Sequence, residues 1–316
     1  MAEEGNEAVT VEDNDYRRDD GQNVDSRRDP ARWKPSWTPD EQRRADSLHK
    51  ALRRTDQYTT LTARGVRPLY ILSGPPGLGK STFVEDIIAR HHEATVIARI
   101  TGRITAWYTY RILAEQHDGF TLVDDADSAW TDPQFVDIMK QASERRPVRR
   151  IHWGTSAAPK VPTSLPAWPE ELLQKLRDNN KGELPKTAPL TYFEFTGSVV
   201  AITNLNLRME AEKAPRKLGL HALLDRANYQ DLGHSTGDIQ LLWCERLNYD
   251  ERLLEKMGLG IEQETEVMSF LRREYRNAHA MSIRLMVKIA EHRRDAPDYW
   301  LEMAADELRP ARQHRP

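Results

Sequence analysis

The stretch that decides the fold is Gly74-Pro75-Pro76-Gly77-Leu78-Gly79-Lys80-Ser81. The apolar run at 69–72 before it predicts a buried strand, and residues 82–89 after it predict a helix. A glycine-rich turn between a strand and a helix is the context of a phosphate-binding loop. In such a loop, backbone N–H groups point at phosphate oxygens, and the helix adds the positive end of its dipole.

This loop predicts that the chain binds a nucleoside triphosphate together with Mg²⁺. Lys80 has both a binding and a catalytic role, because its ammonium group would reach the β- and γ-phosphates. The Ser81 hydroxyl would ligate Mg²⁺. The residues that we expect to contact the nucleotide here are Gly74, Pro75, Pro76, Gly77, Leu78, Gly79, Lys80, Ser81 and Thr82.

Length and cysteine content limit the class of protein. A chain of 316 residues can bury a large core and is long enough for two domains. Its single cysteine, Cys244, excludes a disulfide framework and fits a reducing compartment. No apolar run approaches the length of a membrane span. We therefore expect a cytoplasmic protein, in the host cytoplasm if the source is viral, with no membrane contact.

Charge is concentrated at the N-terminus. Residues 1–32 carry ten Asp or Glu and five Arg, and the whole chain has a net charge of −3, so the remainder carries +2. This nearly neutral body lacks the strongly basic footprint typical of nucleic-acid-binding proteins, although a local basic patch is compatible with it. Because the first 36 residues are polar and acidic, we expect a disordered tail over 1–36.

The order of elements predicts an α/β fold: a parallel sheet sandwiched by helices, followed by a small all-helical lid. A capping box at Thr38 and Glu41 begins the first helix. We expect the α/β domain over 37–235, an insertion at 154–190, the lid over 236–306 and a basic tail at 307–316. The remaining strands are expected at 94–100, 120–123, 148–153, 192–195, 198–203 and 229–232, and the lid helices at 239–247, 262–277, 282–294 and 297–308.

A cluster of acidic residues follows the strand at 120–123. Asp124 is placed to hold Mg²⁺, and Asp125 is our first choice for the residue that orients or deprotonates the attacking water, with Asp127 as its substitute. The alternative is an acidic helix start, where Asp is favoured in any case. The spacing from Lys80 leaves room for a helix, a strand and a second helix, which favours a functional role.

At this point the chain resembles the AAA+ ATPases, in particular small phage-encoded ones, over about residues 40–295. The resemblance implies a viral protein with a role related to replication or packaging. The segments that carry it, in the order Walker A, Walker B, sensor 1, arginine finger and sensor 2, are 74–81, 122–127, 199–204, 222–226 and 281–285.

The resemblance implies roles for three further residues. Asn204 would hold the attacking water and sense the γ-phosphate; an Asx turn is its structural alternative, and Asn206 is a less favoured substitute. Arg226 would reach the nucleotide of a neighbouring subunit, unless it is a surface arginine paired with Asp225. Arg284 would couple lid motion to the phosphates. Where the family usually has Glu after the Walker B Asp, this chain has Asp125, whose shorter side chain favours slow hydrolysis or a clamp.

Two segments are candidates for partner contact. Residues 102–107 occupy the place of the substrate-gripping loop in AAA+ translocases, with Arg103 and Trp107 of suitable type. We prefer the alternative, in which Trp107, Tyr108 and Tyr110 pack their helix onto the sheet. The insertion at 154–190 offers Lys160, Trp168 and Lys175 for the same purpose.

Three functions remain open. The leading one is an AAA+ ATPase that forms a homo-oligomeric ring and remodels a nucleic acid or protein partner. A small-molecule P-loop phosphotransferase is the second, although the helical C-terminal third and the strand that ends in Asn204 disfavour it. The third is a scaffold that binds ATP without hydrolysing it. ATPase assays with and without DNA would separate them.

Overall fold

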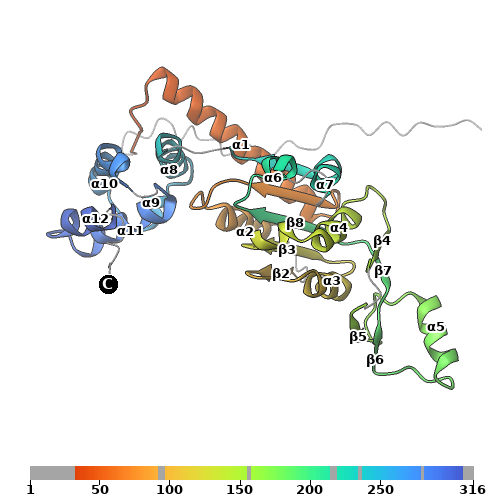
Figure 1. Cartoon of the computed structure of the whole chain (residues 1–316). Helices are drawn as coiled ribbons and strands as arrows, with labels where there is room; N and C mark the ends of the chain where they lie inside the picture. Colours follow the sequence, from red (N-terminus) through yellow and green to blue (C-terminus); the bar gives the residue numbers. More distant parts are fainter. Residues whose placement is uncertain are drawn as a thin grey trace, which may run out of the picture.

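The centre of the molecule is a five-stranded parallel sheet. The computed structural model describes residues 33–91, 97–154, 158–213, 219–233, 237–278 and 281–308. In spatial order the strands of this sheet are β2 (Ile97–Thr101), β3 (Phe120–Asp124), β8 (Ser198–Thr203), β1 (Leu69–Ser73) and β9 (Asn228–Asp231). The α/β fold that the sequence predicts, with a parallel sheet between helices and a helical C-terminal region, is confirmed (Figure 1).

Both faces of the sheet are covered, because its strands are apolar on both sides. Leu69 and Ile71 of β1 belong to one apolar cluster, and Tyr70 and Leu72 to another. The second cluster includes side chains of α1 and α2 (Lys80–His91). The helices that contribute to the first cluster are α3 (Ala106–Glu115), η2 (Asp127–Thr131), α4 (Pro133–Ala142), α6 (Leu207–Lys213) and α7 (Leu220–Arg226).

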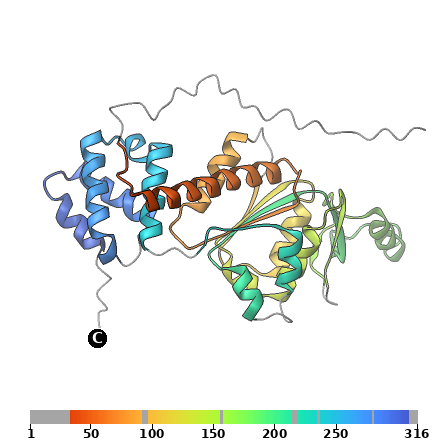
Figure 2. The same ribbon diagram turned by 90° about the horizontal axis from the view of Figure 1, so that it is seen from above.

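Helix α1 (Pro39–Ala63) joins the sheet to the helical region (Figure 2). The expected capping box is present: Glu41 N donates to Thr38 Oγ1, and Thr38 N donates to Glu41 Oε2. This backbone bond lowers the pKa of Glu41. Near the same end, Arg272 forms ion pairs with Glu41 (3.0 Å) and with the buried Glu245 (2.7 Å). The start of α1 is therefore fixed to the helical region, while its later turns pack against the sheet and α2.

The helical region follows the sheet in sequence and has its own apolar core, to which Leu52 of α1 and Leu78 of the phosphate loop also belong. Its core also takes in Trp33, which is 8% exposed, so the expected tail over 1–36 is wrong at its end, and contact begins by residue 33. The sequence pattern predicted helices at 239–247, 262–277, 282–294 and 297–308, the second of which includes the residues of η3, and it missed the shorter α9. The bounds are α8 (Gly237–Glu251), α9 (Leu253–Lys256), α10 (Ile261–Glu274), η3 (Tyr275–Asn277), α11 (Ile283–Asp295) and α12 (Trp300–Leu308).

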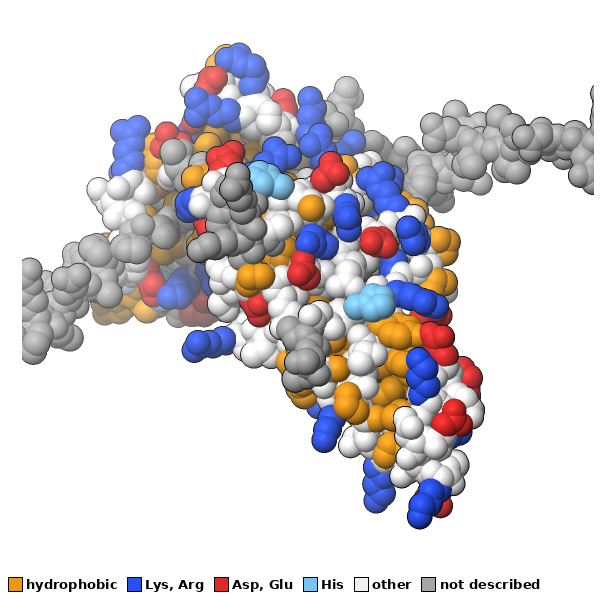
Figure 3. All heavy atoms as spheres, turned by 45° about the vertical axis from the view of Figure 1, so that its right-hand side comes forward, with side chains coloured by type: hydrophobic (Ala, Val, Ile, Leu, Met, Phe, Trp, Pro, Cys, Tyr) orange, Lys and Arg blue, Asp and Glu red, His pale blue; other side chains and the backbone are white. Residues whose placement is uncertain are grey.

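Residues 158–190 form an arm that projects from the α/β region (Figure 1). The arm consists of the antiparallel pair β5 (Lys160–Pro162) and β6 (Thr187–Pro189), with α5 (Glu170–Asn179) beside it. At its base, β4 (Arg149–His152) pairs with β7 (Tyr192–Phe195) outside the parallel sheet. Figure 3 shows apolar side chains gathered on the arm, with Lys and Arg side chains at its rim and tip.

The base of the arm is anchored by two buried polar side chains. The Tyr110 hydroxyl donates to Leu190 O (3.1 Å), and the guanidinium of Arg149 donates to the carbonyl oxygens of Ala142, Phe195 and Gly197. Burial raises the pKa of Tyr110 and lowers the pKa of Arg149 to about 10. The Arg149 bonds tie the β4–β7 pair at the base of the arm to α4, and the Tyr110 bond ties the last residue of the arm to α3.

The expected packing of three aromatic residues on α3 is wrong for two of them. Tyr110 is fully buried, but Trp107 is 40% exposed and Tyr108 is 41% exposed. Both lie in the first turn of α3, next to the exposed Arg103. On the arm, Trp168 is buried and its indole N–H donates to Pro162 O (2.8 Å), which makes it a structural residue rather than a partner contact.

Several expectations fall outside the described residues. These are the tail over 1–32, the first residues of the strand at 94–100, the boundary at 235–236 and the end of the basic tail at 309–316. Among the residues that are described, no helix is both long and apolar enough to cross a membrane.

The anchoring of the arm predicts a loss of stability in Arg149→Met. Methionine fills similar volume but donates to none of the three carbonyl oxygens, so the free energy of unfolding should fall by about 2–4 kcal/mol. Arg150→Met is the matched control, since Arg150 is exposed on the same strand and should change stability by less than about 0.5 kcal/mol. Urea denaturation measures both; equal stability of the two variants would contradict the anchoring role.

Candidate nucleotide site

The phosphate loop connects β1 to α2 in a shape that requires glycine. Gly77 and Gly79 have φ of 83° and 71°, in the left-handed region that other residues rarely adopt. A Cβ atom at Gly77 would lie 2.5 Å from Ser282 Cβ, and one at Gly79 would lie 2.9 Å from Ile283 Cδ1. Because α2 begins at Lys80, its first N–H groups have no partner within the helix and face the loop, which is the arrangement that binds phosphate.

Lys80 is buried at the bottom of this loop, 7% exposed. Its Nζ donates to Gly74 O (2.7 Å), Pro75 O (2.8 Å) and Asn204 Oδ1 (2.9 Å). Burial lowers the pKa of Lys80 to about 8, against the opposing effect of nearby aspartates, and Arg284 lowers it further. The ammonium group is thus held by neutral oxygens that a phosphate can replace.

The two residues expected to bind Mg²⁺, Ser81 of α2 and Asp124 of β3, lie next to each other. Asp124 ends β3 and is 6% exposed, and its Oδ1 accepts a hydrogen bond from Ser81 Oγ at 3.0 Å. A hydroxyl and a carboxylate at this separation are oxygen ligands of the kind that Mg²⁺ takes beside phosphates and water. The residues present therefore fit a magnesium ion bound with the nucleotide.

Asp125 and Asp127 have different environments. Asp125 is exposed in the cavity, with φ of 52°. Asp127 is half-buried and accepts hydrogen bonds from Thr203 Oγ1, Asn204 N and Asn204 Nδ2. Of the two, only Asp125 faces the space where a nucleotide would lie.

Two of the expected site residues lie elsewhere. The substitute Asn206 is not in the cavity: its Oδ1 accepts from Arg208 N and Met209 N at the start of α6, and its Nδ2 donates to Asp231. Arg226 lies outside the cavity of its own chain, 44% exposed at the side chain. It forms an ion pair with Glu144 (3.7 Å) rather than the expected one with Asp225.

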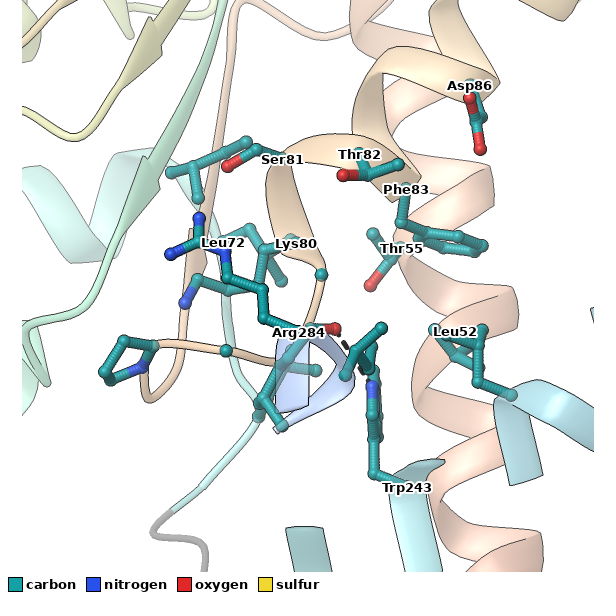
Figure 4. Close-up of a pocket in the computed structure, with 18 of the residues that line it drawn as sticks. Leu52, Thr55, Leu72, Lys80, Ser81, Thr82, Phe83, Asp86, Trp243 and Arg284 are labelled. Atoms are coloured by element: carbon teal, nitrogen blue, oxygen red, sulfur yellow. Dashed lines mark hydrogen bonds between the residues drawn. The ribbon is translucent and has the colours of Figure 1, made fainter. Parts of the chain in front are cut away.

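The helical region touches the phosphate loop directly. Ile283 N donates to Gly77 O (3.0 Å), and the Trp243 indole N–H donates to Leu78 O (2.9 Å). Arg284 extends from α11 over the loop toward Lys80 and Ser81 (Figure 4). The start of α11 and one side chain of α8 are therefore parts of the loop's own surroundings.

A cavity of about 1010 Å³ lies between these elements. It is lined by the loop from Pro76 to Thr82, by Asp124, Asp125 and Asn204, and by Arg284. The expected contacts Gly74 and Pro75 do not line it and instead offer their carbonyl oxygens to Lys80. The sequence analysis missed its apolar side, which includes Leu52, Phe83, Trp243, Leu247, Leu253 and Val287.

Of the residues on the apolar side of the cavity, only Trp243 carries a feature in the sequence that indicates a polar contact. A buried indole N–H needs an acceptor, but nothing local in the sequence shows that the acceptor is Leu78 O. The other side chains read as ordinary core positions on amphipathic helices.

Comparison with known proteins finds likenesses in sequence and in structure. No family model matches the chain. Over 240 residues it is 22% identical to an uncharacterized 36.7 kDa protein in the nrdC–mobD intergenic region of Enterobacteria phage T4. This match covers 74% of the chain, and the chain spans 66% of that protein, just under two thirds of its length. The structure of C. elegans PCH-2 aligns over 85% of this chain and 69% of that one, with 12% identity and a TM-score of 0.36.

The pKa of Lys80 predicts how nucleotide affinity depends on pH. A triphosphate favours the charged lysine, so the pKa of Lys80 rises on binding, and affinity is greatest where Lys80 is already protonated. Above its free pKa of about 8, affinity should therefore fall by up to about tenfold per pH unit. Calorimetric titration with ATP between pH 7.5 and 9.5 measures this; Lys80→Met should bind weakly with no such slope. A flat wild-type profile would contradict the buried lysine.

Proposed function

We propose that this chain is a Mg²⁺-dependent ATPase of the AAA+ type. The observation that carries the proposal is the convergence of Lys80, Asp124 and Asn204 at one edge of the sheet, beneath Arg284 from the helical region. A site for binding alone needs the loop and its lysine, whereas hydrolysis also needs a held metal and an oriented water. The side chains suited to both tasks line the same cavity.

The chain's residues divide this work among them. Bound MgATP supplies the reacting phosphoryl group and a divalent charge. The loop N–H groups and Lys80 hold the phosphates, Ser81 and Asp124 hold the metal, and Asp125 takes a proton from water. Arg284 adds positive charge to the site. Because Arg284 belongs to the helical region, its distance from the phosphates depends on the position of that region.

Two further parts of the proposal concern other molecules. Arg226, exposed and away from its own cavity, completes the site of a neighbouring copy, which makes turnover depend on a homo-oligomeric ring. The remodelled partner, a nucleic acid or a protein, meets the exposed Trp107 and Tyr108 beside Arg103, since aromatic rings stack on bases and pack against peptides.

A scaffold that binds ATP without hydrolysis is the second candidate. It is favoured by Asp125, whose side chain is one methylene shorter than that of the Glu usual in the family. The backbone of Asp125 is also in the left-handed conformation. Turnover by the purified protein decides between the two candidates.

We expect the wild-type protein to hydrolyse ATP with Mg²⁺, and Asp125→Asn to bind ATP normally while turnover falls by roughly 10²–10⁴-fold. Asn tolerates the left-handed backbone as well as Asp does, so the substitution tests chemistry rather than folding. Asp137→Asn, on the exposed face of α4, is the control. Phosphate release with and without single-stranded DNA is the measurement. Binding without turnover in the wild type would leave the scaffold, and full turnover in Asp125→Asn would exclude that residue as the base.

The trans role of Arg226 predicts complementation. Arg226→Ala should lose on the order of 10³-fold in turnover, and Lys80→Ala should lose nucleotide binding. Mixed together, they should recover part of the activity, because a Lys80→Ala copy can offer its Arg226 to an intact nucleotide site. Arg145→Ala, an exposed neighbour of Glu144, should keep full turnover. Absence of recovery at every mixing ratio would count against the role.

A further inference from the structure

Asp127 holds Asn204 by two sets of hydrogen bonds. Its Oδ1 accepts from Asn204 N (3.0 Å) and from Thr203 Oγ1 (2.7 Å). Its Oδ2 accepts from Asn204 Nδ2 (3.0 Å). Asp127 begins η2, just after β3, and Asn204 follows β8, which is the next strand in the sheet. The carboxylate therefore joins the ends of two neighbouring strands beside the cavity.

The Asn204 amide is oriented from both sides. On the side away from Asp127, its Oδ1 accepts a hydrogen bond from Lys80 Nζ at 2.9 Å. Turning the amide over would place Nδ2 against the lysine ammonium and Oδ1 against the carboxylate, and both contacts would be repulsive. Only one orientation is compatible with these neighbours, and it presents the amide oxygen to the phosphate loop.

We propose that Asp127 is a positioning residue that keeps the Asn204 amide oxygen directed at the reacting centre. The inference rests on the proposed function and deepens it. When Lys80 turns to a phosphate, Asn204 Oδ1 loses its donor, while Asp127 still holds Nδ2. The freed oxygen is an acceptor, so Asn204 orients the attacking water and does not donate to the γ-phosphate.

This role replaces the one that the sequence suggested for Asp127, a substitute for the base. Both of its carboxylate oxygens are already acceptors for Thr203 and Asn204, and it is not among the residues that line the cavity. A base must reach the proton that it removes. Asp125, exposed in the cavity, meets that requirement, and Asp127 acts through Asn204.

The first test is Asp127→Asn. Its side chain has one acceptor oxygen instead of two, so its amino group meets Asn204 Nδ2 and forces the amide to turn. We expect kcat for ATP to fall on the order of 10- to 100-fold, as when a residue that hydrogen-bonds to a metal ligand and orients it is replaced. The Kd for MgATP should be unchanged. Asp137→Asn serves again as the control, and thermal melting shows whether each variant is folded.

The second test is rescue. Asn204→Asp alone sets two carboxylates against each other and should also be slow. The double variant Asp127→Asn/Asn204→Asp restores a donor opposite an acceptor and keeps an acceptor oxygen toward Lys80. It should therefore exceed Asp127→Asn in kcat by at least about tenfold, which a purely structural role for Asp127 would not produce. No rescue in a double variant that melts like the wild type would overturn the proposal.

If the double variant has a lower melting temperature than the wild type, Thr203→Val tests the positioning role of Asp127 instead. It removes the bond to Asp127 and the bond that Thr203 Oγ1 accepts from Leu205 N, and it leaves the Asn204 side chain unchanged. We expect kcat to fall with constant Kd, and an unchanged kcat would overturn the positioning role. The two levels of the proposal fail differently. If the wild-type protein binds MgATP without turnover, both the proposed ATPase activity and the positioning role of Asp127 are contradicted. If the wild-type protein hydrolyses ATP and Asp127→Asn keeps the full rate, only the positioning role of Asp127 is contradicted.

Discussion

The buried charge of Lys80 is the constraint on which the rest of the site depends. Lys80 is 7% exposed, and its ammonium group must be surrounded by oxygen atoms. Here they come from the loop itself and from Asn204, with three aspartates nearby. This requirement explains the value of the strand order. Because β8 lies between β1 and β3, its end brings Asn204 against the lysine while β3 brings Asp124 to Ser81.

The helical region shares this environment through hydrogen bonds to the backbone of the phosphate loop. Ile283 N and the Trp243 indole each donate to a carbonyl oxygen of the phosphate loop, and Leu78 belongs to the helical core. A change in the loop must therefore either break these bonds or move the helices with it. Helix α1 adds a second connection, since its first turn is paired with Arg272 and its later turns pack on the sheet.

The sequence predicted those parts of the fold and site that depend on local pattern. The loop, the strand that ends at Asp124 and the strand that ends at Thr203 are each recognisable alone, and parallel strands bring their carboxyl ends to one edge. Contacts between distant segments had no such signal. The exposure of Trp107, the hydrogen bond from Asn206 to Asp231 and the place of Trp243 beside the loop depend on which surfaces meet, which residue type does not determine.

The left-handed backbone of Asp125 also bears on why a short acid stands there. A residue with φ of 52° is tolerated best as Gly, Asn or Asp, whose side chains can bond locally, and a longer acid at that position is strained. The backbone and the side chain are therefore matched. The turn itself directs the carboxylate, and a longer side chain is not compatible with this backbone. A Glu in place of Asp125 would therefore strain the backbone of this turn as well as lengthen the side chain.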